Sequence, residues 1–359
     1  MNNYLAGRRI FPKKMRSSYS NPMPDRPLST EHSEHSAAIP LLSVIICTYN
    51  RAPLLAQVLE SLCEQTLPAE RFEVVMINDG SADDTEAVAD TYAKKLPLRY
   101  FYQRNAGLAS AKNHGLFASR GDLVFFMDDD DIASETLLEE HVKTHLMFPA
   151  QHYAVLGYTA LSPEISPNPL MYFVTEVGCF LFSYPSLKHG DILDYSYFWG
   201  GRSSCKRSFL LEHGIFNSVF RFGAEDIELG YRLSKQGLRV IYNKNAVSIM
   251  VRKISFDAFC HRLERQGSSN YVMSRLHPEP EIQRWAEIVD LDKNWATING
   301  HYDAIVGSAR HLDSIANLKL TSGFDLDDET RYLTYRGYWA AFKACKLKGI
   351  VKKRSLRDG

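Results

Sequence analysis

The chain has 359 residues, of which 45% are hydrophobic, which is enough to form one large or two ordinary domains. Lys+Arg and Asp+Glu both number 42, so no overall charge points to nucleic acid as a partner. The six cysteines form no C-x-x-C pair, which disfavours a zinc site or a disulfide scaffold. Without an apolar run of about 18 residues or a signal-peptide core, we expect a cytoplasmic protein.

Residues 1–40 mix Ser, Pro, Asn, His and charges without periodicity, which predicts a disordered arm. From residue 41 onward, apolar runs typical of buried strands alternate with helical patterns. The strand-like runs are 41–50, 72–80, 98–103 and 122–127, and the helix-like segments are 53–65, 81–96, 108–121 and 134–148. This alternation predicts an α/β fold whose mostly parallel central sheet is built from βαβ units, with helices on both faces.

The regularity fades after residue 150. We expect strands at 152–162 and 238–247, a turn leading into a helix at 197–214, and a helix at 222–237. From about residue 255 the pattern is mainly helical and ends in a basic tail. The predicted domains are therefore the arm 1–40, an α/β domain 41–254 with halves 41–150 and 151–254, and a helical region 255–359.

Four consecutive aspartates, Asp128 to Asp131, follow the strand predicted at 122–127. Ligands of open α/β sheets bind beyond the carboxyl ends of the strands, and adjacent carboxylates repel unless a cation lies among them. The aspartates either cap the next helix or hold Mn²⁺ or Mg²⁺ with a substrate diphosphate. In an extended chain Asp128 and Asp130 face the same side, so these two are the predicted metal ligands.

Two other strand ends carry candidate binding residues. Asp79 either shapes an Asp-Gly turn or accepts a hydrogen bond from a nucleotide base. Thr48, Tyr49 and Arg51 follow the first strand, where an aromatic ring beside hydrogen-bond donors can stack on and bind a base. A generic loop explains these three residues equally well.

The segment "NAGLASAKNHG" places Asn105 and Lys112 near the same edge of the sheet. Its glycine and small residues permit close approach of the backbone to a ligand. Lys112 either faces a phosphate group or lies on a solvated helix face. We include Asn105 and Lys112 among the predicted ligand contacts.

The acidic pair Glu225-Asp226 opens the helix predicted at 222–237. It either complements the helix dipole or provides a general base across the crevice. Trp199, Gly200 and Gly201 form either an acceptor-binding turn or a packed tryptophan beside a tight turn.

The segments "SVIICTYNR", "VVMINDGSADDT", "NAGLASAKNHGL", "GDLVFFMDDDD", "GGRSSCKRSFL" and "FGAEDIELGYRL", in this order, resemble the family 2 glycosyltransferases, which have the GT-A fold. Each segment is a weak signal alone, but six in order at plausible spacings are a strong one. The resemblance extends from about residue 42 to residue 246.

The resemblance implies an inverting transferase that uses a nucleotide-diphospho-sugar donor, with uridine as the favoured base, and Mn²⁺ or Mg²⁺. It implies that Asp79 contacts the base, that Asp128 and Asp130 form the D-x-D metal element, and that Asp226 is the general base. Residues 41–150 would then bind the donor and residues 151–254 the acceptor. The implied donor contacts are Thr48, Tyr49, Arg51, Asp79, Asn105, Lys112, Asp128 and Asp129, and the implied acceptor contacts are Trp199, Gly200, Gly201 and Glu225.

The sequence departs from the family pattern at one position of the implied metal site. Met250 stands about where many relatives carry a histidine that can bind the metal. A degenerate transferase that serves as a nucleotide- or glycan-binding scaffold is therefore the alternative function. A haloacid-dehalogenase-like phosphatase fits less well, because three βα units precede "FFMDDDDI". A nucleotidyltransferase also fits less well, because the first predicted strand is not followed by a Gly-rich phosphate loop.

The C-terminal tail has seven Lys/Arg between Lys343 and Arg357, interleaved with Trp339, Phe342 and Ile350. It is either a solvated basic tail or an interfacial helix that binds anionic lipid at the inner face of the cell membrane. The acceptor implied by the resemblance is a glycan or a lipid-linked glycan.

Overall fold

The structure is a computed structural model that describes residues 40–358. The arm predicted over residues 1–40 therefore lies, except for its last residue, outside the described part. The strands are β1 (Leu42–Thr48), β2 (Phe72–Asn78), β3 (Leu98–Tyr102), β4 (Leu123–Met127), β5 (Asp131–Ala133), β6 (Tyr153–Leu161), β7 (Ile192–Leu193), β8 (Ser203–Lys206) and β9 (Arg239–Met250).

The helices of the α/β part are α1 (Ala52–Cys63), α2 (Thr85–Tyr92), α3 (Leu108–Ala118), α4 (Leu137–Met147), α5 (Pro169–Tyr172), α6 (Arg207–His213) and α7 (Glu225–Ser234). The C-terminal helices are α8 (Phe256–Leu276), α9 (Pro280–Trp285), α10 (Leu291–Ile298), α11 (Tyr302–Thr321) and α12 (Asp328–Asp358).

One nine-stranded sheet runs through the α/β part in the order β3-β2-β1-β4-β8-β6-β9-β5, with β7 paired to β9. Strands β1 to β4 are parallel, and β1 lies between β2 and β4. The second half is mixed, because β8 runs antiparallel to both β4 and β6. The carboxyl ends of β1, β2 and β4 consequently meet at one edge.

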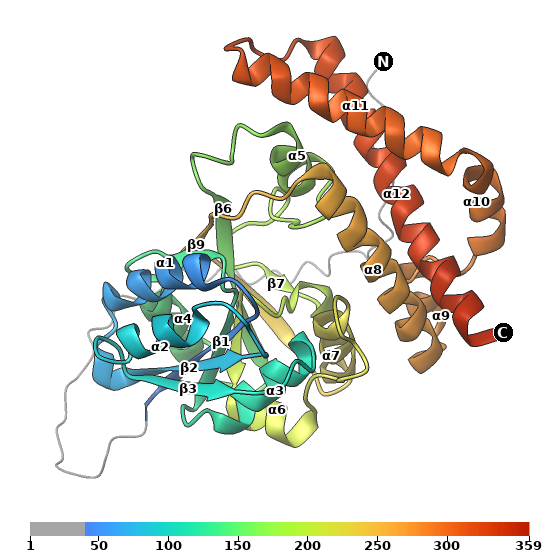
Figure 1. Ribbon diagram of the computed structural model, residues 1–359. Helices are drawn as coiled ribbons and strands as arrows, with labels where there is room; N and C mark the ends of the chain where they lie inside the picture. Colours follow the sequence, from blue (N-terminus) through green and yellow to red (C-terminus); the bar gives the residue numbers. More distant parts are fainter. Residues whose placement is uncertain (1–39, 359) are drawn as a thin grey trace, which may run out of the picture.

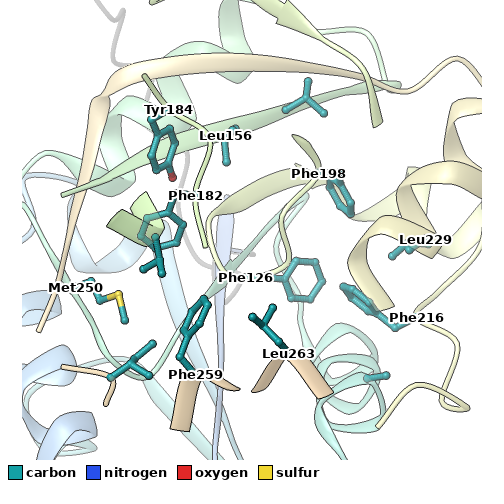
Figure 2. Packing of buried hydrophobic residues seen from close by; sticks show 14 of the residues in the cluster. Phe126, Leu156, Phe182, Tyr184, Phe198, Phe216, Leu229, Met250, Phe259 and Leu263 are labelled. Carbon is teal, nitrogen blue, oxygen red and sulfur yellow. The ribbon is translucent and has the colours of Figure 1, made fainter. Parts of the chain in front are cut away.

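Helices cover both faces of the sheet (Figure 1). Val44 and Ile46 of β1 belong to an apolar cluster with residues of α1, α2 and α4, whereas Ile45 belongs to a cluster with residues of α3, α6 and α7. Alternate side chains of β1 are thus buried on opposite faces, which explains its continuous apolar run. In the second cluster, shown in Figure 2, the rings of Phe126 and Phe216 meet edge to face at 5.1 Å. The predicted fold class is confirmed.

Two predictions about local structure are wrong. Residues 203–206 form strand β8 and not a turn, because they fill the gap between β4 and β6. The aspartates do not continue β4 as an extended chain, because Asp129 and Asp130 occupy a tight turn before β5. The alternation that would place Asp128 and Asp130 on one side therefore does not apply.

The C-terminal region is helical, as the sequence indicates, and packs on the α/β part through α8 (Figure 1). Phe259 of α8 and Phe342 of α12 are fully buried, with ring centroids 4.8 Å apart. Phe173, from a helical turn after α5, also contacts Phe342. One apolar cluster contains these rings together with residues of the sheet, so the helical region shares its core with the α/β part.

Helices α8 and α12 touch through their backbones at two glycines. A Cβ atom on Gly267 would lie closer than 3.0 Å to the carbonyl oxygen of Lys346, and one on Gly349 equally close to that of Glu264. Only glycine permits this approach, since real Cβ contacts essentially never fall below that distance.

The apolar residues of the basic tail face the protein. Phe342 and Ile350 are fully buried in α12. Lys346 pairs with Glu287 at 2.8 Å and Lys348 with Glu264 at 3.1 Å. Within residues 40–358, no helix combines the length and the apolar character needed to cross a membrane.

Candidate active site

Asp79 at the end of β2 organises the loop that follows β3. Its Oδ1 accepts hydrogen bonds from Nε2 of Gln103 at 2.7 Å and from the amide of Ala106 at 2.9 Å, while Oδ2 accepts one from the amide of Gly107 at 3.0 Å. Nδ2 of Asn105 donates to the backbone carbonyl of Asp79 at 3.0 Å. The structure thus brings Asp79 and Asn105 together, with the buried carboxylate fixed by the loop.

The loop after β1 lies against the loop after β2. The amide of Asn50 donates to Oγ of Ser81 at 2.9 Å, and Oδ1 of Asn50 accepts from the amide of Ala82 at 2.8 Å. Thr48 is buried, whereas the ring of Tyr49 is about half exposed. Tyr49 is consequently available to a flat ligand at this edge of the sheet.

Arginines from distant parts of the chain pair with the turn between β4 and β5. Nη1 of Arg51 donates to Oδ1 of Asp129 at 2.6 Å and lies 3.6 Å from Oδ2 of Asp130. Nε of Arg252 donates to the same Oδ2 of Asp130. Strand pairing between β5 and β9 brings Arg252 here, since Asp131 lies opposite Met250.

Arg202 contacts the first and the last of the four consecutive aspartates, Asp128 and Asp131. Its Nη1 donates to Oδ2 of Asp128 at 2.8 Å, and its Nη2 lies 2.9 Å from Oδ2 of Asp131. Nε donates to Oγ1 of Thr159 at 2.8 Å, and the guanidinium lies 4.3 Å from the ring centroid of Phe182. Two hydrogen bonds, an ion pair and a ring contact therefore fix its orientation.

Burial and the neighbouring arginines shift the pKa values of the aspartates in different directions. Burial raises the pKa of Asp131 to about 8 and that of Asp129 to about 6, although Arg202 and Arg51, respectively, oppose the rise. Burial also acts on Asp128, but Arg202 and Lys112 hold its pKa below the ordinary value. Asp128 is thus a carboxylate at neutral pH, whereas Asp131 tends to keep its proton.

The two glycines after Trp199 let the chain pass between Asp128 and Asp226. A Cβ on Gly201 would lie closer than 3.0 Å to the carboxylate of Asp128, and one on Gly200 would lie 2.6 Å from Nζ of Lys112. Trp199 itself is packed, with Nε1 donating to the carbonyl of Ser196 at 2.8 Å. The glycine pair therefore contacts the centre of the site, while the indole supports the turn.

Asp226 lies in the first turn of α7, just after a residue with left-handed backbone, Ala224 (φ 66°). Its Oδ2 accepts from the amide of Gly200 at 3.2 Å, and its Oδ1 accepts from the amide of Ile227 at 2.8 Å. Burial, followed by the charge of Glu225, raises the pKa of Asp226. A raised pKa makes a carboxylate a stronger base once it is ionised.

Lys112 and Glu225 form a buried ion pair beside Asp226. Nζ of Lys112 lies 3.1 Å from Oε1 of Glu225, and both side chains are almost fully buried. Burial lowers the pKa of Lys112, but the charges of Glu225 and Asp226 outweigh it and raise the pKa overall. This burial favours a positioning role for both residues over the direct ligand contacts predicted for them.

The residues of the predicted metal site do not fit a divalent cation in this arrangement. Asp128 and Asp130 each share Oδ2 with an arginine. Met250 is buried in the apolar cluster of Figure 2. Within residues 40–358, no three or more His, Cys, Asp and Glu side chains are grouped to hold a metal. The predicted ligands Asp128 and Asp130 thus remain a prediction that this geometry does not favour.

Sequence reasoning identified Arg51 but missed two other arginines of the site, Arg202 and Arg252. Arg202 lies in the quoted segment "GGRSSCKRSFL", and Arg252 lies two residues after Met250. Their acidic partners Asp128 and Asp130 are 74 and 122 residues away in the sequence. The only available signal was a basic residue near a segment already assigned to the site, which is too common to be informative.

Among solved structures, the fold resembles transferases of the GT-A class. A mannosyltransferase from Pyrobaculum calidifontis, solved with GDP-Man and Mn²⁺, superimposes with a TM-score of 0.59 at 20% identity, covering 88% of both chains. TarS from S. aureus, solved with UDP-GlcNAc, gives a TM-score of 0.50 at 14% identity, covering 89% of this chain and 92% of that one.

Residues 43–161 match the profile of glycosyl transferase family 2. Validoxylamine A glucosyltransferase from Streptomyces hygroscopicus subsp. jinggangensis is 32% identical over 234 residues, or 59% of this chain and 55% of the relative. The cholesterol galactosyltransferase of Borreliella burgdorferi is 36% identical over 99 residues, or 27% of each chain. This chain spans about half the length of the validoxylamine relatives that it matches. Residues 43–161 are therefore similar to the domain of family 2 glycosyltransferases, and the resemblance seen in the sequence is confirmed for this part of the chain.

Proposed function

We propose that the protein is an inverting glycosyltransferase that moves a sugar from a nucleotide-diphospho-sugar to a hydroxyl group of a glycan or glycolipid. The match of residues 43–161 to the family 2 profile supports the reaction class. The observation that carries the assignment of roles is the glycine pair, because Gly200 and Gly201 join Asp226 on one side to Asp128 on the other. The proposed general base, Asp226, and the proposed donor contact, Asp128, thus lie on the two sides of the same turn.

Asp226 is the proposed general base. Its ionised carboxylate accepts the proton of the acceptor hydroxyl while that oxygen forms a bond to the anomeric carbon. The bond from the anomeric carbon to the diphosphate breaks on the opposite face, so the configuration inverts and a nucleoside diphosphate leaves. The amide of Gly200 keeps Oδ2 of Asp226 oriented. A base placed in this way contributes roughly 10²–10⁴-fold to the rate.

The donor binds, in this proposal, across the ends of β1, β2 and β4. The half-exposed ring of Tyr49 stacks on the base, which is bordered by Asp79 at the end of β2 and by Asn105 in the loop after β3. Among the neighbours in fold, one was solved with UDP-GlcNAc and another with GDP-Man. We propose a UDP-sugar first, with GDP- and dTDP-sugars as the comparison.

Two predictions from the sequence, the use of a divalent metal and contact with the membrane, are separate from this mechanism. The use of Mn²⁺ or Mg²⁺ is not part of it, because arginines already occupy the carboxylates of Asp128 and Asp130. Peripheral contact with the inner face of the cell membrane rests on the exposed Lys343 and Lys352 of α12, since Phe342 and Ile350 are buried.

The test is release of nucleoside diphosphate from a panel of UDP-, GDP- and dTDP-sugars, with and without glycan and glycolipid acceptors. Asp226→Asn is the base variant, and Asp303→Asn, at an exposed position of α11, is the matched control. We expect one donor to turn over in the wild type and the control, with Asp226→Asn slower by roughly 10²–10⁴-fold. Nucleotide binding without any turnover would instead favour the scaffold function.

A further inference from the structure

At the turn between β4 and β5, the relative exposure of the acidic and basic side chains determines which charge an entering ligand contacts first. The side chains of Asp129 and Asp130 are 5% and 4% exposed, whereas those of Arg51 and Arg252, which pair with them, are 38% and 29% exposed. The carboxylates therefore lie beneath the guanidinium groups. A ligand that approaches this part of the crevice contacts positive charge first, which is the reverse of what a carboxylate metal site presents.

Arg252 retains donors for a ligand while it pairs with Asp130. It uses Nε for this contact. A guanidinium has five N–H donors in a rigid fork, so its terminal nitrogens can bind phosphate oxygens. Met250, two residues earlier, faces the apolar cluster. Near the end of β9, where the family resemblance implies a metal ligand, this chain thus has the cation Arg252.

A third arginine strengthens the positive field. Arg262 of α8 lies 5.0 Å from the ring centroid of Phe222. Burial and the charges of Arg252 and Arg202 lower the pKa of Arg262, although Asp128 and Glu225 oppose this, so these groups lie close enough to interact. A polyanion between Arg252 and Arg262 would relieve the repulsion.

We propose that Arg252, together with Arg51, binds the donor diphosphate directly and that the enzyme therefore needs no divalent metal. The inference rests on the proposed function, because it takes the ligand to be a nucleoside diphosphate. The guanidinium groups neutralise the charge that develops on the leaving diphosphate, as arginine clamps on transferring phosphates do. Asp129 and Asp130 then serve to position the two arginines.

The experiment is calorimetric titration of the full chain with UDP, GDP and dTDP, in excess EDTA and in Mn²⁺. We expect one nucleotide to bind in EDTA with an affinity that Mn²⁺ changes by no more than about threefold. Arg252→Gln should weaken binding in EDTA by roughly tenfold to hundredfold, which is the range of one charged hydrogen bond. Arg252→Lys should recover part of the loss. Lys253→Gln, at the exposed next position, is the control and should stay within about twofold of wild type.

The outcomes separate the two claims. Binding that requires Mn²⁺ and is unchanged in Arg252→Gln overturns the inference and leaves the proposed function intact. Absence of binding by all three nucleotides in both conditions overturns the proposed function and the inference with it. If Arg252→Gln fails to fold, Mn²⁺ alone is titrated into the wild type and followed by electron paramagnetic resonance. Stoichiometric Mn²⁺ binding would overturn the inference, whereas its absence together with nucleotide binding in EDTA supports it.

Discussion

Replacing Gly201 by alanine tests whether the position of the Asp128 carboxylate matters to donor binding. The new Cβ would lie closer than 3.0 Å to Cγ and both oxygens of Asp128, so the carboxylate must move. The backbone of residue 201 cannot easily move away from that of Asp128, because the amide of Asp128 donates to the carbonyl of Gly201 at 3.2 Å. The displaced carboxylate loses its 2.8 Å hydrogen bond with Arg202.

The magnitude follows from that lost contact. A hydrogen bond between charged groups contributes about 1.5–3 kcal/mol, which corresponds to roughly tenfold to 150-fold in an equilibrium constant. Restoring the carboxylate to its position would cost up to this energy, so we expect Gly201→Ala to weaken nucleotide binding, and to lower kcat/KM for the donor, by up to that factor. Calorimetry with the nucleotide that binds best and steady-state assays of diphosphate release measure the two quantities.

Gly307→Ala in α11 is the matched control, since a Cβ there meets nothing within 4 Å. It should leave binding unchanged and raise the free energy of unfolding by about 0.5–1 kcal/mol. If Gly201→Ala binds nucleotide as tightly as wild type while remaining folded, the reasoning that assigns Asp128 to the donor is refuted.

Three further predictions concern the base, the buried acid and the helical region. Because the pKa of Asp226 is raised, turnover should decline as the pH falls through that pKa, and the residual turnover of Asp226→Asn should lack this acidic limb in a pH–rate profile. The pKa of Asp131 rises from 3.8 to about 8 on folding, so the folded state holds more protons between these values and the free energy of unfolding should fall as pH rises from about 4 to about 8. Urea unfolding should show a smaller fall for Asp131→Asn, and an equal fall would contradict the assignment. Phe342→Ala should lower the free energy of unfolding by about 3–5 kcal/mol, since its ring is fully buried; a loss below about 1 kcal/mol would mean that α12 is not part of the core.

The sequence predicted what depends on local pattern. The apolar run around Val44 to Ile46 predicts a strand buried on both faces, and β1 is buried in that way in the structure. Strand β8, with the sequence SSCK, carries no such pattern and exists because its two neighbours supply hydrogen-bond partners. The aspartates were recognisable as a site, but their pairing with Arg51, Arg202 and Arg252 was not. Those pairings depend on how β1 and β8 flank β4, and on how β9 pairs with β5, in three dimensions.

The backbone contact between α8 and α12 has a practical consequence for testing whether the protein binds lipid. A shortened chain that ends before α12 would expose the side of α8 around Gly267 and would remove Phe342 and Ile350 from the core. Loss of liposome binding by such a chain would report damage to the fold. Reversing charge at Lys343 and Lys352 leaves the helix crossing untouched, because both side chains are exposed, and so isolates the electrostatic contribution of α12.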